Sequence, residues 1–388
     1  MNKDILATEV QKFIINYSKS ISELAFSGSP FPSIKIKELL QQIENRNKVS
    51  HKLPTWFQSE AIYYPPKLNL EQTSSEITAK YKSTLVKGKT IADITGGFGV
   101  DSYYFSKYFT AVIHCEKDKC LSAIAAHNFK QLKSSNITCI ANNGLNEITK
   151  HSYDLIYIDP SRRHEHKGRV YRLIDCEPNI PKEINKLFTS TEQIMIKTSP
   201  MLDITQGIKE LKMVSQIHIV AVNNDVKEVL WLLQKGYNEV IKIKTINIGK
   251  QTSQKFNYRL GDICTPIFSL PEKYLYEPNA AIMKSGAFNL VSERYSINKL
   301  HQNSHLYTSK VLKDFPGRRF LITRILKFSK KDLKELKAIK KANLSTRNFP
   351  ESVASLRNKM KIADGGNLYL FFTTDLNNNK IIICCTKA

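Results

Sequence analysis

One short stretch, residues 92–101, contains residue types that can hold a nucleotide-like ligand. Its sequence is ADITGGFGVD, in which Asp93 ends an apolar run and Gly97 and Gly99 follow in the next turn. Glycines let a ligand approach the backbone, and a helix that begins there offers free N–H groups. A dinucleotide site needs the spacing G-x-G-x-x-G, which is incomplete here. The spacing D-x-x-x-G-x-G instead favours a site for S-adenosylmethionine (SAM), with a glycine-rich turn in an unrelated α/β protein as the alternative.

Polar residues also follow the next two apolar runs of the chain. Glu116 ends the run AVIHCE and stands 23 residues after Asp93. A carboxylate at a strand end can accept hydrogen bonds from both hydroxyls of a ribose. Asn142 and Asn143 follow the run NITCI, from where their side chains can reach an adenine ring. The alternatives are an exposed strand end for Glu116 and plain loop positions for the two asparagines.

The fourth apolar run ends in Asp159, Pro160, Ser161, Arg162 and Arg163. Open α/β sheets bind ligands at the carboxyl ends of their strands. In methyltransferases that act on amino groups of bases, this place carries D/N-P-P-Y/F, which accepts hydrogen bonds from the amine and aligns it. We therefore predict Asp159, Pro160, Ser161 and Arg162 as catalytic, although Ser161 and Arg162 replace the second proline and the aromatic residue. The two arginines can clamp phosphate or stack on bases, and solvent exposure is the alternative.

Other catalytic and metal-binding patterns are absent from the sequence. It contains no G-x-S-x-G, no H-E-x-x-H, no G-x-x-x-x-G-K-[ST] and no C-x-x-C pair. His164 and His166 form an H-x-H pair without a convincing set of further ligands, so we predict a basic loop and no metal. Seven cysteines, an odd number without paired spacing, indicate a reducing, cytoplasmic compartment.

Six short apolar runs place these polar residues at one edge of a predicted sheet. Helix-like segments separate the runs, which are TIADI, AVIHC, NITCI, DLIYI, QIMIK and HIVAV. This alternation predicts β-α-β units and a parallel sheet covered by helices on both faces, over residues 91–248. Apolar residues at helical spacing predict helices in the first 50 residues and another over residues 72–85. We expect the N-terminal helical region to pack on the sheet, with a cover for the site as an alternative.

The last part of the chain predicts a small unit of mixed α/β structure. The string KKDLKELKAIKKA predicts a lysine-rich helix over residues 330–342, and a second helix is expected over 353–361. Two strands, LYLFFTT and KIIICC, are joined by NNN, which fits a hairpin. Alternating aromatic residues in the first of these strands, Tyr369, Phe371 and Phe372, favour a core position over stacking on bases.

The chain is strongly basic, most of all in its last third. Of 388 residues, 58 are Lys or Arg and 35 are Asp or Glu, a formal net charge of +23. Residues 251–388 hold 24 basic and 10 acidic residues, so +14, which leaves 23 − 14 = +9 for the first 250. Such an excess favours a polyanionic partner, nucleic acid first, with a generally basic proteome as the alternative. No membrane partner is expected, since no apolar run approaches ~18 residues, and the N-terminus lacks the pattern of a secretory signal.

Several strings together resemble one bacterial family, and the resemblance covers nearly the whole chain. They are LEQTSSEITA, ADITGGFGVDS, DLIYIDPSRR, YLYEPNAAIMKSGAF, LHQNSHLYTS, NLSTRNFPESVASLR and DGGNLYLFFTT. The family is one of class I SAM-dependent methyltransferases that carry a ferredoxin-like segment and a THUMP-like domain after the catalytic domain. The resemblance implies a Rossmann-like seven-stranded sheet of the α/β class, an N-terminal helical region and a small C-terminal α+β (THUMP-like) domain.

The resemblance also implies domain boundaries and a cofactor site. The expected parts are an N-terminal helical region over 1–70, a SAM-dependent methyltransferase domain over 71–270, a ferredoxin-like segment over 271–316 and a THUMP-like domain over 317–388. The helix around Gln72–Thr78 is expected to cover the methionine end of SAM. The full set of predicted cofactor-binding residues is Gln72, Ser75, Thr78, Asp93, Thr95, Gly96, Gly97, Phe98, Gly99, Asp101, Glu116, Lys117, Asn142, Asn143 and Asp159.

The favoured function is methylation of a base in tRNA or rRNA, at an exocyclic amine. Asp159-Pro160 would orient the acceptor, and the N-terminal helices are a further candidate contact with RNA. The predicted RNA-binding residues are Arg162, Arg163, Arg318, Arg319, Lys331, Lys334 and Arg347. The alternatives are a methyltransferase acting on a protein or small molecule, and a non-catalytic protein that binds SAM or RNA. The sequence does not indicate an oligomeric state.

Overall fold

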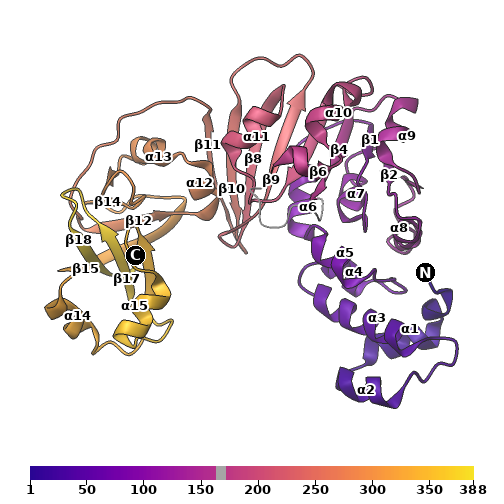
Figure 1. Ribbon diagram of the computed structural model, residues 1–388, viewed down its shortest axis with the longest axis horizontal. Coiled ribbons are helices and arrows are strands. Elements are labelled where there is room, and N and C mark those ends of the chain that lie inside the picture. Colours follow the sequence, from indigo (N-terminus) through magenta and orange to yellow (C-terminus); the bar gives the residue numbers. More distant parts are fainter. Residues whose placement is uncertain (163–171) are drawn as a thin grey trace. The chain divides into compact units, whose positions relative to one another are not determined.

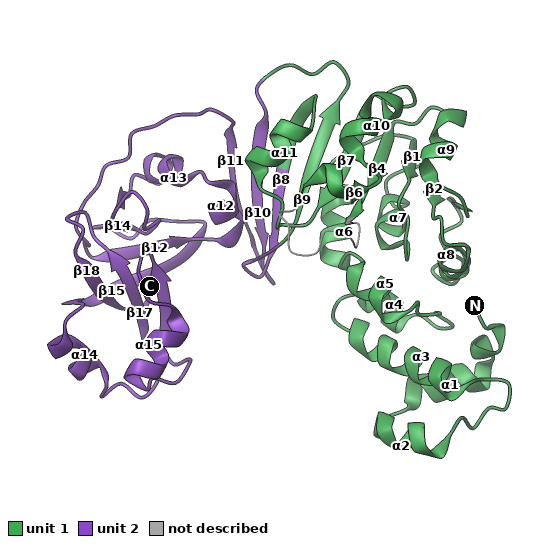
Figure 2. Cartoon of the chain, in the orientation of Figure 1, with its two compact units in different colours: residues 1–217, 227–239 green, residues 218–226, 240–388 purple. Residues whose placement is uncertain are grey.

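The computed structural model describes residues 1–162 and 172–388 of the chain (Figure 1). Arg163, His164 and His166 lie outside the described residues. The chain divides into two compact units, shown in different colours in Figure 2. Unit 1 contains Met1–Ile217 and Lys227–Glu239, and unit 2 contains His218–Val226 and Val240–Ala388. The finer division into four parts stays a prediction.

The largest sheet has nine strands in the order β11-β10-β8-β9-β7-β4-β1-β2-β3. All six apolar runs singled out in the sequence form strands of this sheet, so the prediction of a Rossmann-like sheet is confirmed. The strands are β1 (Thr90–Asp93), β2 (Ala111–Cys115), β3 (Ile137–Ile140), β4 (Leu155–Ile158), β7 (Gln193–Thr198), β8 (Val214–Val222), β9 (Asp225–Gln234), β10 (Lys242–Ile248) and β11 (Ser253–Arg259). The seven strands from β3 to β8 are the expected sheet, and the antiparallel pair β10 and β11 follows β8 in the strand order.

Five of these strands are parallel, which brings their carboxyl ends to one edge. Strand β1 pairs with β2 on one side and β4 on the other, β2 pairs with β3, and β4 pairs with β7. Asp93, Glu116 and Asp159 each end or follow one of these strands and therefore reach the same edge. The predicted convergence of the three carboxylates is confirmed by this topology.

Strand β9 was not among the predicted strands, and it enters the sheet in the opposite direction. It pairs antiparallel with β7, with Thr198 opposite Val229. A two-residue turn joins β8 to β9, and its residues Asn223 and Asn224 have φ angles of 50° and 65°. Asparagine tolerates this left-handed conformation better than most residues. Because β9 runs backward, its first residues lie level with the carboxyl end of β7.

In the described part of the chain, six α-helices lie directly before and between the strands of this sheet. They are α6 (Glu76–Ser83), α7 (Val100–Phe105), α8 (Lys119–Gln131), α9 (Gly144–Glu147), α10 (Ile180–Leu187) and α11 (Ile204–Glu210). Helix α8 begins where the Asp118 carboxylate accepts hydrogen bonds from the backbone N–H groups of Cys120 and Leu121, at 2.8 and 3.1 Å. Helix α6 is shorter than predicted, because Ser75 caps it at the Thr78 N–H.

The N-terminal region packs against helices of the sheet, as we expected. It contains α1 (Thr8–Asn16), α2 (Ile21–Ser27), α3 (Ile36–Val49), α4 (Pro54–Gln58) and α5 (Lys67–Gln72). Its apolar side chains share one core cluster with Tyr103 and Tyr104 of α7 and with Phe129 of α8. Trp56 of α4 is fully buried there, and its ring lies 4.9 Å from the ring of Tyr103. This region is therefore part of the same hydrophobic core as the helices beside the glycine turn.

Unit 2 contains a seven-stranded sheet in the order β13-β14-β12-β15-β18-β17-β16. Its strands are β12 (Tyr274–Pro278), β13 (Asn298–Lys299), β14 (Tyr307–Ser309), β15 (Gly317–Lys327), β16 (Asn343–Arg347), β17 (Tyr369–Thr374) and β18 (Lys380–Lys387). Its helices are α12 (Ala280–Ser285), α13 (Phe288–Tyr295), α14 (Lys330–Leu336) and α15 (Val353–Met360). Strands β17 and β18 form the predicted hairpin. Helix α14 ends six residues before its predicted end, where the chain turns to bridge Lys341 to Ala363.

The aromatic residues of β17 belong to the core of unit 2. Phe371 and Phe372 are fully buried, and the ring of Phe371 lies 5.0 Å from that of Phe320. These two rings are not placed to stack on bases, so the favoured core prediction is confirmed. Among the described residues, no helix has the length and apolar character needed to cross a membrane.

We expect Trp56→Ala to lower the free energy of unfolding by roughly 3–5 kcal/mol, because it removes the buried indole that joins α4 to α7. Urea denaturation of the full chain measures this change. The matched control is Phe26→Ala, since the Phe26 side chain is 93% exposed and its removal should change stability by no more than ~0.5 kcal/mol. Equal midpoints for the two variants would contradict the assigned core.

Candidate active site at the carboxyl edge of the sheet

The glycine turn after β1 leaves open space over one residue. The Gly96 α-carbon packs against the His114 ring and that of Gly99 against the Phe129 ring, so a Cβ at either position would clash. At Gly97, a Cβ would meet only the Thr95 oxygen, at 3.9 Å. Gly97 and Gly99 have φ angles of 56° and 88°, which favour glycine. The backbone of Gly97 is therefore the part of the turn that a ligand can approach.

Glu116 lies beside this open position. One of its carboxylate oxygens accepts a hydrogen bond from the Gly97 N–H at 2.9 Å, and the other accepts one from the Asp118 N–H at 2.8 Å. The neighbouring Lys117 pairs with Glu177 at 3.0 Å on the surface. The structure thus brings together Glu116 and Gly97, two residues predicted separately for one ligand.

Asp93 stabilises the glycine turn through buried hydrogen bonds. It is 1% exposed, and its carboxylate accepts hydrogen bonds from the Ser102 hydroxyl at 2.6 Å and the Thr95 N–H at 3.2 Å. Burial raises the pKa of Asp93 to about 7, although both hydrogen bonds act in the opposite direction. Thr95 also accepts a hydrogen bond from the Asp159 N–H at 2.7 Å, which ties the turn to the end of β4.

The two asparagines predicted for the adenine ring bond locally. Asn143 accepts a hydrogen bond from the Leu145 N–H at 3.0 Å and so caps α9. Asn142 donates to the Glu147 carboxylate. Both residues lie after β3 near the same edge as Glu116, and their contact with a ligand stays a prediction.

The segment before α6 reaches the site through a residue that we did not predict. Ser75 and Thr78 are used in the helix cap, and Gln72 ends α5. The Ser74 hydroxyl instead donates to the Asp101 carboxylate at 2.8 Å. The Tyr157 hydroxyl donates to the same carboxylate oxygen at 2.8 Å.

A buried ion cluster lies behind these residues. Lys82 of α6 is fully buried, and its ammonium group contacts Glu228 of β9 at 2.8 Å and Asp101 at 3.1 Å. It also donates to the Ser74 hydroxyl at 3.0 Å. The Glu228 side chain is 3% exposed, and burial raises the pKa of its carboxyl group. Burial also raises the pKa of Asp101, but the nearby ammonium groups of Lys82 and Lys197 lower it by more. The pKa of Asp101 therefore lies below its ordinary value.

Asp159 and Lys197 form an ion pair on the open side of this cluster. Lys197, near the end of β7, contacts the Asp159 carboxylate directly and lies 3.4 Å from the Ser74 hydroxyl. The Lys197 and Asp159 side chains are 12% and 32% exposed, against 0% for Lys82. Burial lowers the pKa of Lys197, but the carboxylates of Asp159, Asp101 and Glu228 raise it above the ordinary value. Lys197 therefore carries a positive charge.

Sequence patterns missed four residues of this site: Ser74, Lys82, Lys197 and Glu228. A possible signal is a single charge at the end of an otherwise apolar run, as in QIMIK before Thr198 and in E-VLWLL from Glu228. Only the pairing of β7 with β9 shows that the two charges lie near each other at one edge of the sheet. Of the other predicted catalytic residues, Pro160 follows Asp159, and Ser161 and Arg162 form β5, which pairs with Cys176 and Glu177.

Unit 2 holds the predicted RNA-binding residues that follow β12. Arg318 donates to the Glu277 carboxylate at 2.6 Å and Arg347 at 2.8 Å, and Glu277 itself is 2% exposed. Lys331 and Lys334 are exposed on α14. Arg319 lies 3.6 Å from the exposed Asp314. The exposed lysines are therefore more accessible to a phosphate than the two paired arginines.

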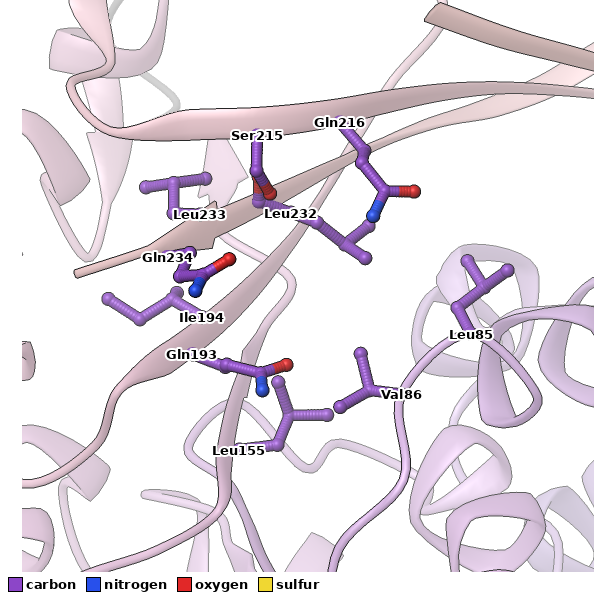
Figure 3. A pocket seen from close by; sticks show the side chains of 10 residues that line it. All are labelled: Leu85, Val86, Leu155, Gln193, Ile194, Ser215, Gln216, Leu232, Leu233 and Gln234. Carbon is purple, nitrogen blue, oxygen red and sulfur yellow. The ribbon is translucent and has the colours of Figure 1, made fainter. Parts of the chain in front are cut away.

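A small cavity of about 90 Å³ lies at the opposite edge of the sheet (Figure 3). Leu155 and Gln193, which begin β4 and β7, line it together with Gln234 at the end of β9. Ligand pockets usually measure ~300–1,000 Å³, so this cavity is too small for a nucleoside. Among the described residues, no group of three or more His, Cys, Asp or Glu side chains is arranged to hold a metal ion.

We expect Asp93→Asn to change how stability depends on pH. The folded protein holds the pKa of Asp93 at about 7 against an ordinary 3.8, so folding favours the protonated form. Its contribution is complete below about pH 4 and is lost as pH rises to about 7, a loss on the order of 4 kcal/mol. The variant lacks this titration, so its unfolding free energy should gain on the wild type between about pH 4 and 8 in urea denaturation. Parallel pH profiles would contradict the assigned burial.

Comparison with known proteins supports the same architecture over the full chain. Two family models match, a ferredoxin-like domain over residues 274–316 and a THUMP domain-like model over residues 317–387. The structure of a "putative methyltransferase" from Porphyromonas gingivalis W83 is 33% identical, has a TM-score of 0.90, and the match covers 100% of this chain and 98% of that chain. No curated protein matches the chain.

Two further solved structures resemble part of the chain. One is called a "putative methyltransferase" and the other a "putative RNA methyltransferase". One from Streptococcus mutans, in complex with SAH, is 16% identical over 41% of this chain and 96% of that chain, with a TM-score of 0.30. The other, from Pyrococcus horikoshii, is 15% identical over 45% of this chain and 92% of that chain, with a TM-score of 0.33. The chain belongs to the bacterial family of class I methyltransferases that carry a ferredoxin-like segment and a THUMP-like domain after the catalytic sheet.

Proposed function

We propose that this protein is a SAM-dependent methyltransferase that acts on RNA. The observation that carries the proposal is the open backbone of Gly97 beside the Glu116 carboxylate, at the same sheet edge as the Asp159–Lys197 pair. Glu116 would accept hydrogen bonds from the ribose of SAM, and Gly97 would lie against its nucleoside. When bound, SAM supplies an activated methyl group on a positively charged sulfur.

The charge of the buried cluster supports a cationic cofactor. Lys82 and Lys197 contribute two positive charges, and the carboxylates in direct contact with them, Asp101, Asp159 and Glu228, contribute three negative ones when all are ionised, so the sum over these five contacting groups is 2 − 3 = −1. An excess carboxylate in a partly buried site favours a cation nearby. The same cluster disfavours a cofactor whose reacting end is an anion.

Two observations support RNA as the substrate. The last 138 residues carry a net charge of +14, and most of them match the ferredoxin-like and THUMP-like models. Exposed lysines on α14 can contact phosphates, which position a nucleic acid without specifying its sequence.

We also propose a cytoplasmic location, because all seven cysteines are free thiols, as a reducing compartment maintains them. The exocyclic amine predicted as the acceptor would have to share Asp159 with Lys197.

Calorimetric titration of the full chain with SAM and, separately, with NADH tests the cofactor. We expect binding of SAM in the micromolar range and none of NADH. Transfer of a radiolabelled methyl group to RNA from a strain that lacks the gene then tests the substrate, with a protein extract of the same strain as the second acceptor. Absence of SAM binding, or label only in protein, would overturn the proposal.

We expect Glu116→Ala to weaken SAM binding by roughly 1.5–3 kcal/mol, because a carboxylate that accepts hydrogen bonds from hydroxyls contributes that much. The same titration measures it. Glu192→Ala is the matched control, since Glu192 is exposed, pairs only with a surface lysine among the described contacts, and precedes β7 at the opposite edge. Equal affinities for the two variants would remove Glu116 from the site.

We expect the double variant Lys331→Ala/Lys334→Ala to bind RNA more weakly. The slope of log affinity against log salt should fall by about 1 for each phosphate that the variant no longer neutralises. Stability should remain within ~0.5 kcal/mol, because both side chains are exposed. Arg347→Ala is the contrasting variant. It leaves the buried Glu277 with one partner fewer and should destabilise the fold. A salt slope that the double variant does not change would exclude α14 from the RNA interface.

A further inference from the structure

Four charged side chains, two lysines and two carboxylates, lie together with Asp101 at the carboxyl edge of the sheet. In the order Lys82, Asp159, Lys197 and Glu228, they come from α6, the end of β4, the end of β7 and the start of β9. Asp159 and Lys197 retain partial exposure, whereas Lys82 and Glu228 are buried behind them. The partly exposed pair of Asp159 and Lys197 is thus the part of the cluster that an acceptor molecule can contact. The chemical group that this pair can bind decides which atom is methylated. This inference rests on the proposed function.

An exocyclic amine is poorly matched to this pair. Its lone pair is delocalised into the base, so it acts as a hydrogen-bond donor and accepts weakly. The Lys197 ammonium is also a donor without acceptor capacity. Both would compete for the Asp159 carboxylate, which Lys197 already contacts. The amine nitrogen would then face an N–H group with which it cannot bond.

A hydroxyl group is matched to the same pair. It has one O–H donor and two acceptor lone pairs, so it can donate to Asp159 and accept from Lys197 at once. The raised pKa of Lys197 keeps that donor charged at neutral pH. In an RNA chain, the hydroxyl present at every internal nucleotide is the 2′-hydroxyl of the ribose.

We propose that the acceptor is the 2′-hydroxyl oxygen of a ribose in RNA, held between Asp159 and Lys197. The hydroxyl proton passes to the Asp159 carboxylate. The oxygen forms a bond to the methyl carbon of SAM, while the bond from that carbon to sulfur breaks and its electron pair stays on sulfur. The products are a 2′-O-methyl ether, neutral S-adenosylhomocysteine and one proton, which leaves the partly exposed Asp159 for solvent.

Lys197 acts in this step by stabilising negative charge. Charge develops on the oxygen as its proton leaves, and a fixed ammonium beside it lowers the barrier. Lys82 and Glu228 are positioning residues. Lys82 bonds Ser74, and Ser74 in turn lies 3.4 Å from the Lys197 ammonium. The buried pair thereby limits where the Lys197 ammonium can lie.

The experiment locates the methyl group on the wild-type product. RNA from a strain that lacks the gene is treated with the full chain and radiolabelled SAM, and then hydrolysed in alkali. A 2′-O-methyl group blocks attack of that oxygen on the next phosphate, so the label should appear in alkali-resistant dinucleotides. Label in the mononucleotides that alkali releases would lie on a base. It would overturn this inference and leave the proposed function intact. No transfer to any RNA would overturn the proposed function and, with it, this inference.

Two variants test the role of Lys197. Lys197→Met keeps the length of the side chain and removes the charge, and should reduce transfer by about 10²–10³-fold while SAM affinity, measured by calorimetry, stays within a few-fold. Lys197→Arg keeps the charge and should retain a measurable part of the activity. Lys235→Met is the matched control, because Lys235 forms a surface pair with Glu192 at the opposite edge. Full activity of Lys197→Met would exclude the proposed role, and the position of the label tests the acceptor even if that variant does not fold.

Discussion

The Lys82 ammonium group is removed from solvent, and the arrangement of the sheet edge depends on the groups that compensate its charge. An unpaired buried ammonium costs several kcal/mol, and removal of one partner of a buried pair costs ~3–5 kcal/mol. Its partners Glu228, Asp101 and Ser74 come from β9, α7 and the segment before α6. Three segments that are distant in sequence are thereby held at the ends of β4 and β7. Asp159 and Lys197 are partly exposed in front of this buried group, where a substrate can reach them.

The sequence was sufficient to predict the sheet and the glycine turn, because both depend on local patterns. The six apolar runs are short and β-rich, and each forms a strand. Asp93, Gly97 and Glu116 were correctly placed at one edge, since parallel strands end together. Strand β9, which we did not predict, is an apolar run in the sequence, and such a run can form either a helix or a strand. Its antiparallel entry is a tertiary feature that no local signal specifies.

The ion cluster could not be predicted, because its members meet only in the folded chain. Lys82 and Glu228 are 146 residues apart and carry no mutual spacing signal. The same limitation affected the basic residues of unit 2. A count of charges cannot distinguish Arg318 and Arg347, which share the buried Glu277, from Lys331 and Lys334, which are exposed. The asparagines after β3 show the same limitation, since helix capping and ligand binding use the same side-chain oxygen.

The glycines of the turn have unequal reasons to be retained during evolution. Gly97 alone has open space above it, whereas Gly96 and Gly99 are required by the rings of His114 and Phe129 packed against them. Selection for a well-packed interior would therefore preserve two of these glycines in a descendant that had stopped binding any ligand. The positive φ angle of Gly97 also favours glycine at that position without a ligand. In this lineage, a change at position 116 would therefore reveal the loss of a working site before the glycine-rich signature itself decayed.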